Sequence, residues 1–203
     1  MSRVLAVLLI GSLLIAPAHA AGLRASGAEG PAEQVRVQAL DGPGSVDPFA
    51  VPAGVKAIVF LFTSTDCPIS NRYAPEVRRI AEAFAAQGVV FRLVYPNPAE
   101  TAPAIREHMA AFAYAGATKA FRDPRHALVK FVGATVTPEA AVVASGHVVY
   151  RGRIDDRHVD FGLDRPVPTR HDLAEALIAG LAGKPVTPST TQAVGCFIAD
   201  FAR

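Results

Sequence analysis

Two cysteines, Cys67 and Cys196, are the residues of this 203-residue chain with the most distinctive chemistry. Cys67 follows the polar run Thr63 to Asp66, and the residues after it have apolar positions at helical spacing, so its thiol is predicted at the start of a helix. The unpaired N–H groups and the dipole of a helix start favour the thiolate, which is the reactive form. Asp66 opposes that effect by like-charge repulsion. Cys67 is therefore the candidate nucleophile.

Cys196 lies in an apolar segment, QAVGCFIADF, that is too apolar to remain in solvent and is expected to dock on the domain. If it docks over Cys67, it can resolve a mixed disulfide or a sulfenic acid on that residue. Two alternatives stay open at this point. The cysteines can form a permanent disulfide, which would close a loop of roughly 130 residues and add up to about 5 kcal/mol of stability, or they can act as independent thiols.

The elements that must position Cys67 form a β-α-β unit. The unbroken apolar run from Ala57 to Phe62 is typical of a strand buried on both faces of a parallel sheet. A helix follows Cys67, Gly88 ends it, and the run from Val89 to Tyr95 predicts the next parallel strand. The class expected is therefore α/β.

The rest of the chain supplies further strands and helices. An alanine-rich segment after Ala99 predicts a helix with Pro103 in its first turn, and Asp123 is placed to start another helix. The residues from Ala140 to Arg151 predict a β-hairpin, and Thr169 is expected to cap a last helix.

The ends of the chain predict an exported protein. Arg3, a short apolar run and an A-x-A sequence ending at Ala20 are typical of a signal peptide over residues 1–20, with an uncleaved anchor as the alternative. A flexible leader at 21–33, one domain at 34–183 and a C-terminal tail at 184–203 are expected to follow. The net charge of +2 predicts neither a nucleic acid nor, after cleavage, a membrane as partner.

Three local features, taken with the order of elements, resemble the thioredoxin-like superfamily, and within it the redoxin (AhpC/TSA-type, peroxiredoxin-like) group. Cys67 lies at the position of the active-site turn, Pro75 where the first helix is kinked, and Thr137-Pro138 where a cis-proline faces the cysteine. The resemblance implies a central mixed sheet flanked by helices, here with a docked C-terminal tail. It also implies that the Thr137 and Pro138 backbone pairs with an extended substrate.

The sequence departs from the superfamily at the redox motif, because Cys-x-x-Cys is replaced by Cys67-Pro68-Ile69-Ser70. Ser70 cannot form a disulfide. Ser64 matches the hydroxyl residue of the peroxiredoxin motif, although Phe60 stands where that motif has proline. The candidate catalytic residues are thus Cys67, Cys196, Ser64 and Ser70.

Arg153 is a candidate for stabilising the thiolate or binding an acidic group of a substrate, with surface ion pairing as the alternative. The substrate-binding candidates are therefore Thr137, Pro138 and Arg153.

The function expected is that of an exported, periplasmic or secreted thiol oxidoreductase that exchanges disulfides or reduces peroxides without a cofactor. Its partners would be protein thiols and disulfides or a small peroxide, together with an external thiol reductant. One alternative is a copper(I)-handling protein that uses Cys67, Cys196 and His158, since thiolates select this ion. The other is a binding domain with a permanent, redox-inactive disulfide.

Overall fold

The structure is a computed structural model that describes residues 35–42, 44–114 and 118–199. The expected signal peptide at 1–20 and leader at 21–33 lie outside the described residues, as do the last four residues of the tail. In the described ranges, no helix is both long and apolar enough to cross a membrane.

A seven-stranded mixed sheet with the order β2-β1-β5-β4-β3-β7-β8 forms the centre of the fold. Strands β3, β4 and β5 are parallel, whereas β7 runs antiparallel to β3 and pairs with β8 in the predicted hairpin. β1 and β2 extend the sheet beyond β5. The strands are β1 Val37–Ala39, β2 Ser45–Val46, β3 Ala57–Phe62, β4 Val89–Tyr95, β5 Lys119–Arg122, β7 Glu139–Ala144 and β8 His147–Gly152.

Every residue of β3 is buried, as its unbroken apolar sequence predicts. Alternate side chains enter two separate cores because successive residues of a strand point to opposite faces. Val59 and Leu61 lie in the core on one face, and Phe60 and Phe62 lie in the core on the other. This double burial fixes the end of β3, and with it the turn that carries Cys67.

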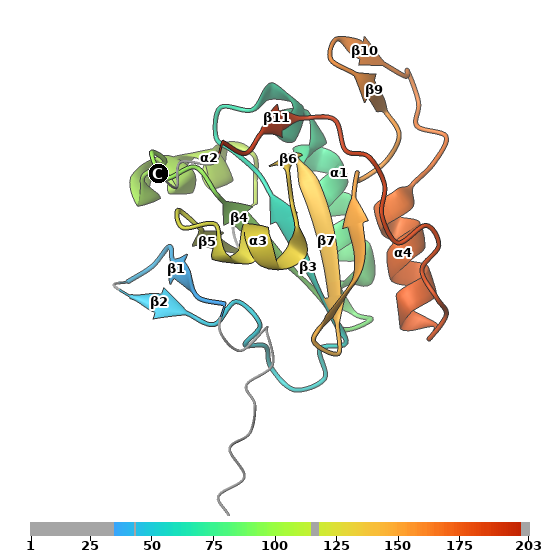
Figure 1. Cartoon of the computed structure of the whole chain (residues 1–203), viewed down its shortest axis with the longest axis horizontal. Coiled ribbons are helices and arrows are strands. Elements are labelled where there is room, and N and C mark those ends of the chain that lie inside the picture. Colours follow the sequence, from blue (N-terminus) through green and yellow to red (C-terminus); the bar gives the residue numbers. More distant parts are fainter. Residues whose placement is uncertain (1–34, 43, 115–117, 200–203) are drawn as a thin grey trace, which may run out of the picture.

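Helices cover both faces of the sheet (Figure 1). α1 (Pro68–Ala85), α2 (Ala102–Ala111) and α4 (Asp172–Leu181) pack on the first core, and α3 (Ala127–Val132) packs on the second. The expected positions of Pro103, in the first turn of α2, and of Asp123, before α3, are both confirmed. The buried Asp123 carboxylate accepts hydrogen bonds from three backbone N–H groups at the start of α3, at 2.8 to 2.9 Å.

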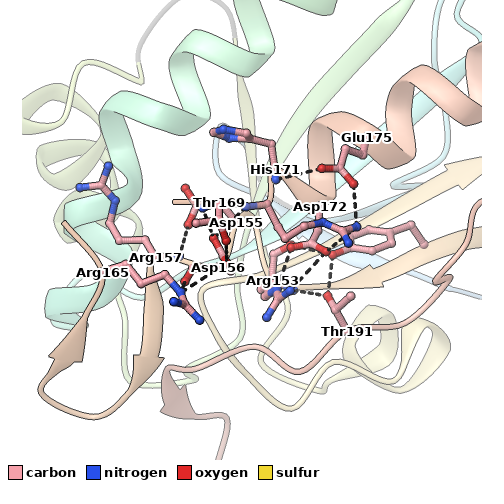
Figure 2. A network of polar contacts seen from close by, with 12 residues as sticks. Arg153, Asp155, Asp156, Arg157, Arg165, Thr169, His171, Asp172, Glu175 and Thr191 are labelled. Atoms are coloured by element: carbon pink, nitrogen blue, oxygen red, sulfur yellow. Dashed lines mark hydrogen bonds and ion pairs between the residues drawn. The ribbon is translucent and has the colours of Figure 1, made fainter. Parts of the chain in front are cut away.

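The prediction that Thr169 caps the last helix is wrong. The carboxylate of Asp156 accepts bonds from the Thr169 N–H at 2.7 Å and from its hydroxyl at 2.5 Å, and α4 begins three residues later, at Asp172 (Figure 2). Asp156 is buried and also accepts from the Arg170 N–H, so this carboxylate competes successfully for the hydroxyl.

The tail after α4 docks on the domain, as expected. It first follows β8, where Arg151 donates its N–H to Ser189 at 2.9 Å and accepts from Thr191 at 3.0 Å. It then continues along the same end of the sheet, past the start of β7, where β11 (Cys196–Phe197) pairs antiparallel with β6 (Val136–Thr137) (Figure 1). Cys196 lies opposite Thr137 in this pairing. A small hairpin, β9 (His158–Asp160) with β10 (Leu163–Asp164), projects from the molecule.

Candidate active site at the start of α1

Cys67 is the residue immediately before α1, at the end of the turn that follows β3. Its side chain is 1% exposed. The sulfur lies 3.0 Å from the backbone oxygen of Thr137 and 2.6 Å from the sulfur of Cys196, and both cysteines are free thiols in this structure. Three segments that are distant in the sequence therefore meet at one sulfur atom.

Thr137 is held in this place by a buried carboxylate. Its peptide bond to Pro138 is cis. Glu139, which is 3% exposed, accepts hydrogen bonds from the Thr135 N–H at 2.7 Å and the Val136 N–H at 3.3 Å, and it pairs with Arg151 at 3.5 Å. Sequence reasoning used Pro138 and missed Glu139. The available signal was an acidic residue at the head of an apolar strand.

Gly195 explains how Cys196 can approach so closely. A Cβ atom at position 195 would lie 2.2 Å from the backbone oxygen of Thr137, which is far inside van der Waals contact. The absence of a side chain lets the tail lie directly on β6. Beyond the cysteine, the N–H of Ile198 donates to the oxygen of Thr135 at 3.0 Å and Ile198 packs against the second core.

The two thiols have opposite electrostatic tendencies. Burial alone raises the pKa of Cys67, but hydrogen bonds from Cys196 and Ser70 outweigh this effect, and the pKa falls below its ordinary value. The pKa of Cys196 is raised to about 12, first by burial and then by its hydrogen bond to Cys67 and the negative charges of Cys67 and Asp66. The pair therefore favours a Cys67 thiolate that accepts a hydrogen bond from the Cys196 thiol.

The two serine candidates occupy different environments. The Ser70 hydroxyl is buried at the first turn of α1 and has no other hydrogen-bond partner within the described part of the chain, so its interaction is with the Cys67 thiolate, whose pKa it lowers. The Ser64 hydroxyl instead bonds to the carboxylates of Asp66 and of Glu100, the latter at 3.0 Å. Ser64 contributes its backbone oxygen to the Cys67 N–H, at 3.4 Å. The hydroxyl of Ser64, a catalytic candidate because it matches the peroxiredoxin motif, therefore contacts two acidic side chains and not the Cys67 sulfur.

Glu100 is a second acidic residue that sequence reasoning missed. It is 6% exposed, and its carboxylate accepts from the Thr65 N–H at 2.6 Å, which fixes the turn before Cys67. Burial raises the pKa of Glu100, hydrogen bonds from Thr65 and Ser64 offset part of the rise, and the charge of Asp66 adds to it. The sequence offers little signal for this residue, because it lies 33 positions beyond the cysteine.

A polar chain supports the same turn from the other side. The Asn71 amide donates to the Thr65 oxygen at 3.3 Å and contacts Nε2 of His108 at 2.8 Å. The other ring nitrogen of His108 lies 2.9 Å from the hydroxyl of Tyr95. Burial lowers the pKa of His108, so the neutral ring is favoured. These contacts connect α1, α2 and β4 to the loop that carries the cysteine.

Arg153 does not join the site. Its guanidinium pairs with the buried Asp172 at the start of α4, with Nε 2.7 Å from the carboxylate (Figure 2). The physical reason is that Asp172, which is 4% exposed, needs a compensating charge, and Arg153 is the partner at 2.7 Å. The ion-pair alternative for Arg153 is therefore the one that the geometry supports.

His158 is also directed elsewhere. Its Nδ1 contacts Asp164 in the β9–β10 hairpin, and its ring packs edge-on against Tyr73 with centroids 5.1 Å apart. Among the described residues, the only group of three ligand atoms close enough to share a metal ion is Glu76, Asp155 and His171. The ligands of the copper alternative, Cys67, Cys196 and His158, are thus not brought together, because the hairpin holds the histidine ring against Asp164.

A cavity of about 210 Å³ opens beside Cys196 and not beside Cys67. The lining belongs to the turn before α1, the loop after β4, the β6 edge and the tail: Ser64, Asp66, Pro96, Asn97, His126, Thr137, Cys196, Phe197, Ile198 and Ala199. Phe197 at its border is 81% exposed. Of the two cysteines, Cys196 is therefore the one that lines open space.

No protein-family model matches the chain, and neither does any curated protein. Solved structures do. An uncharacterized conserved protein from Geobacillus kaustophilus matches with a TM-score of 0.69 at 22% identity, over 83% of this chain and 89% of that one. A hypothetical protein from Sinorhizobium meliloti 1021 matches with a TM-score of 0.67 at 24% identity, over 83% and 91%.

A third structure carries a descriptive title: a secreted Mycobacterium tuberculosis disulfide oxidoreductase homologous to E. coli DsbE. It matches with a TM-score of 0.50 at 15% identity, over 74% of this chain and 96% of that one. At these identities the likeness is one of fold. The chain has a thioredoxin-like α/β fold, as its sequence predicted, with a central mixed sheet flanked by helices.

Proposed function

We propose that the protein is an exported thiol–disulfide oxidoreductase whose redox pair is Cys67 and Cys196. The observation that carries this proposal is the approach of the two sulfurs to 2.6 Å, although the residues are 129 positions apart. A disulfide bond of about 2.05 Å requires only a small movement from there. Cys196 takes the place of the second cysteine that the Cys67-Pro68-Ile69-Ser70 motif lacks.

The difference in pKa between the two thiols supports a catalytic role for the pair and not a purely structural one. A cysteine with a lowered pKa is both a better-populated nucleophile and a better leaving group, and Cys67 has this property while Cys196 has the reverse. Disulfide exchange is favoured over peroxide reduction, because the Ser64 hydroxyl that matched the peroxidase motif bonds to Asp66 and Glu100 and not to the sulfur.

Export follows from the predicted signal peptide at 1–20, and the secreted M. tuberculosis protein of the same fold supports it by analogy. Protein thiols and disulfides are the partners proposed for an oxidoreductase in that compartment, with an external thiol as reductant.

The test is the redox potential of the pair, measured by equilibration with glutathione or dithiothreitol buffers, together with disulfide exchange activity. A value between roughly −120 and −270 mV is expected for a catalytic pair, and structural disulfides lie below about −300 mV. Turnover should be lost in both Cys67→Ser and Cys196→Ser. A potential below −300 mV with no turnover would instead establish the permanent disulfide.

A further inference from the structure

We propose that the cavity beside Cys196 is the entry site for the reducing thiol, and that this thiol attacks the sulfur of Cys196 and not that of Cys67. This inference rests on the proposed function and specifies it. In it, the cysteine at the start of α1 is the leaving group of the reductive step, and the cysteine of the tail is the point of attack.

Access is the first argument. Cys67 is 1% exposed, because Thr137 and Cys196 both cover its sulfur. Cys196 is partly exposed and lines the 210 Å³ cavity, whereas Cys67 does not. A nucleophile from solvent therefore meets the Cys196 sulfur first.

Anchoring of the tail is the second argument, since a tail that detached would uncover Cys67. Before the cysteine, the hydroxyl of Thr191 bonds to Tyr150 at 2.6 Å and to the Arg153 N–H at 3.1 Å. After it, Ile198 is bonded to Thr135 at 3.0 Å and packs on the second core. Cys196 is thus held on both sides, and reduction need not wait for the tail to leave.

The reaction balances without a further reactant. A thiolate RS⁻ attacks the Cys196 sulfur of the disulfide; the bond from Cys196 to the attacking sulfur forms, the Cys67–Cys196 bond breaks, and the electron pair leaves on Cys67 as thiolate. A second thiolate then attacks the R-bearing sulfur of the Cys196 mixed disulfide. The bond between that sulfur and Cys196 breaks, RSSR forms, and the Cys196 thiolate takes a proton from water. Two thiols are oxidised and one disulfide is reduced.

The electrostatics of the pair agree with this direction. Exchange is faster when the leaving thiol has the lower pKa, and Cys67 is the cysteine whose pKa is lowered. Attack on Cys67 would expel Cys196, whose pKa is raised to about 12, and would therefore be the slower route even with equal access.

The cavity also indicates which thiols enter. Its volume is below the roughly 300–1,000 Å³ of pockets for drug-sized ligands, so it admits a small thiol or the end of a cysteine side chain. Asp66 contributes negative charge, and neither lysine nor arginine is among the described lining residues. A neutral or cationic thiol should enter more readily than an anionic one. A small-molecule thiol and a protein cysteine both have this chemistry.

The experiment traps the first intermediate on the oxidised full-length chain. Brief exposure to 2-mercaptoethanol, acid quenching and alkylation, followed by peptide mass spectrometry, locate the mercaptoethanol adduct and the alkyl group. At the earliest times the adduct should be on Cys196 and the alkyl group on Cys67, in at least about tenfold excess over the reverse. A second arm uses a protein thiol with a single cysteine, and the faster arm identifies the source.

An adduct on Cys67, or equal amounts on both cysteines, would overturn this inference while leaving the proposed redox pair intact. A chain that forms no disulfide under oxidising conditions would overturn both. As a matched comparison, cysteamine should reduce the disulfide about two- to fivefold faster than 3-mercaptopropionate after normalisation to a small reference disulfide, and Asp66→Asn should narrow that ratio. An unchanged ratio in Asp66→Asn would contradict entry past Asp66.

Discussion

At the scale of single residues, the site is a pair of unequal thiols. The sequence places Cys67 at a helix start, where the helix dipole lowers the pKa of its thiol and the charge of Asp66 raises it. The sequence does not show which effect is larger. The structure adds two donors, Cys196 and Ser70, whose hydrogen bonds favour the thiolate. The reactive form of Cys67 therefore depends on a residue 129 positions away.

The first prediction concerns this dependence. In the reduced protein, the thiolate absorbance of Cys67 should titrate with a midpoint below the ordinary value of about 8.5, and the midpoint should rise in Cys196→Ala because the donated hydrogen bond is lost. Ser70→Ala should raise it as well. Ultraviolet titration of the reduced variants measures the midpoint. A midpoint in Cys196→Ala that stays at or below the wild-type value would exclude the thiol as a donor.

The second prediction concerns Glu100, whose pKa is raised by burial. A group with a raised pKa in the folded state contributes full stability below its ordinary value of about 4.3, and this contribution is lost as the pH rises through the folded pKa. Glu100→Gln removes the charge and keeps an oxygen for the Thr65 N–H. The variant should therefore gain stability relative to the wild type as the pH rises from about 4 to 7.

Urea unfolding of both proteins across this pH range measures the difference. A wild-type protein that becomes relatively more stable toward pH 7 would show that the ionised Glu100 is favoured in the fold. Glu107 to Gln, a change to a glutamate on the exposed surface of α2, serves as the control and should give no such trend.

At the scale of elements, β11 is the segment that adds the second cysteine to the turn between β3 and α1. It contributes only two residues, but they pair with β6 at Thr137 and bring Cys196 onto Cys67. The close approach depends on Gly195, since any Cβ there would collide with the Thr137 oxygen at 2.2 Å.

The third prediction follows from that collision. Gly195→Ala should displace β11, slow the formation of the Cys67–Cys196 disulfide by tenfold or more, and leave the domain folded. Disulfide formation at a fixed glutathione ratio, followed by mass spectrometry, measures the effect, and circular dichroism checks the fold. Gly180→Ala in α4 is the matched control, because a Cβ there meets no atom within 4 Å and alanine is the better helix former. Equal rates in the two variants would show that the tail tolerates the shift.

At the scale of the whole molecule, the two cysteines connect the first β-α-β unit to the end of the chain. In the chain-entropy model, a disulfide that closes a loop of roughly 130 residues stabilises the folded state by up to about 5 kcal/mol. The docked tail already places the thiols together, so the oxidised form should need no rearrangement of the sheet.

The fourth prediction is that oxidation raises the free energy of unfolding by about 2 to 5 kcal/mol, and that Cys67→Ser and Cys196→Ser each abolish the difference between oxidising and reducing conditions. Urea denaturation with and without dithiothreitol measures it. A smaller increase in the free energy of unfolding, or none, would mean that the tail leaves the folded domain in the reduced state. Forming the disulfide would then carry the entropic cost of ordering the tail.

The sequence by itself determined the β-α-β unit and the place of Cys67, because the apolar runs of β3 and β4 and the helical spacing of α1 are local patterns. It also indicated, through resemblance, the thioredoxin-like fold and the turn at Thr137-Pro138. The tertiary structure decided which distant groups reach the thiol. Three such groups are Glu100, Glu139 and His108. Two of their contacts join residues 36 and 37 positions apart, and the burial of all three side chains is not a local property of the sequence.

The same limit explains the corrections. Arg153 and His158 have side chains that could stabilise a thiolate or bind a metal, but each contacts an acidic residue instead. Arg153 pairs with Asp172 and His158 contacts Asp164, and no local sequence pattern predicts either partner. The partnership of Cys67 and Cys196 remained open in the sequence because docking of the tail depends on the absence of a side chain at Gly195 and on the free edge of β6. Burial and close approach are properties of the folded chain as a whole, and they, not residue type, selected the members of this site.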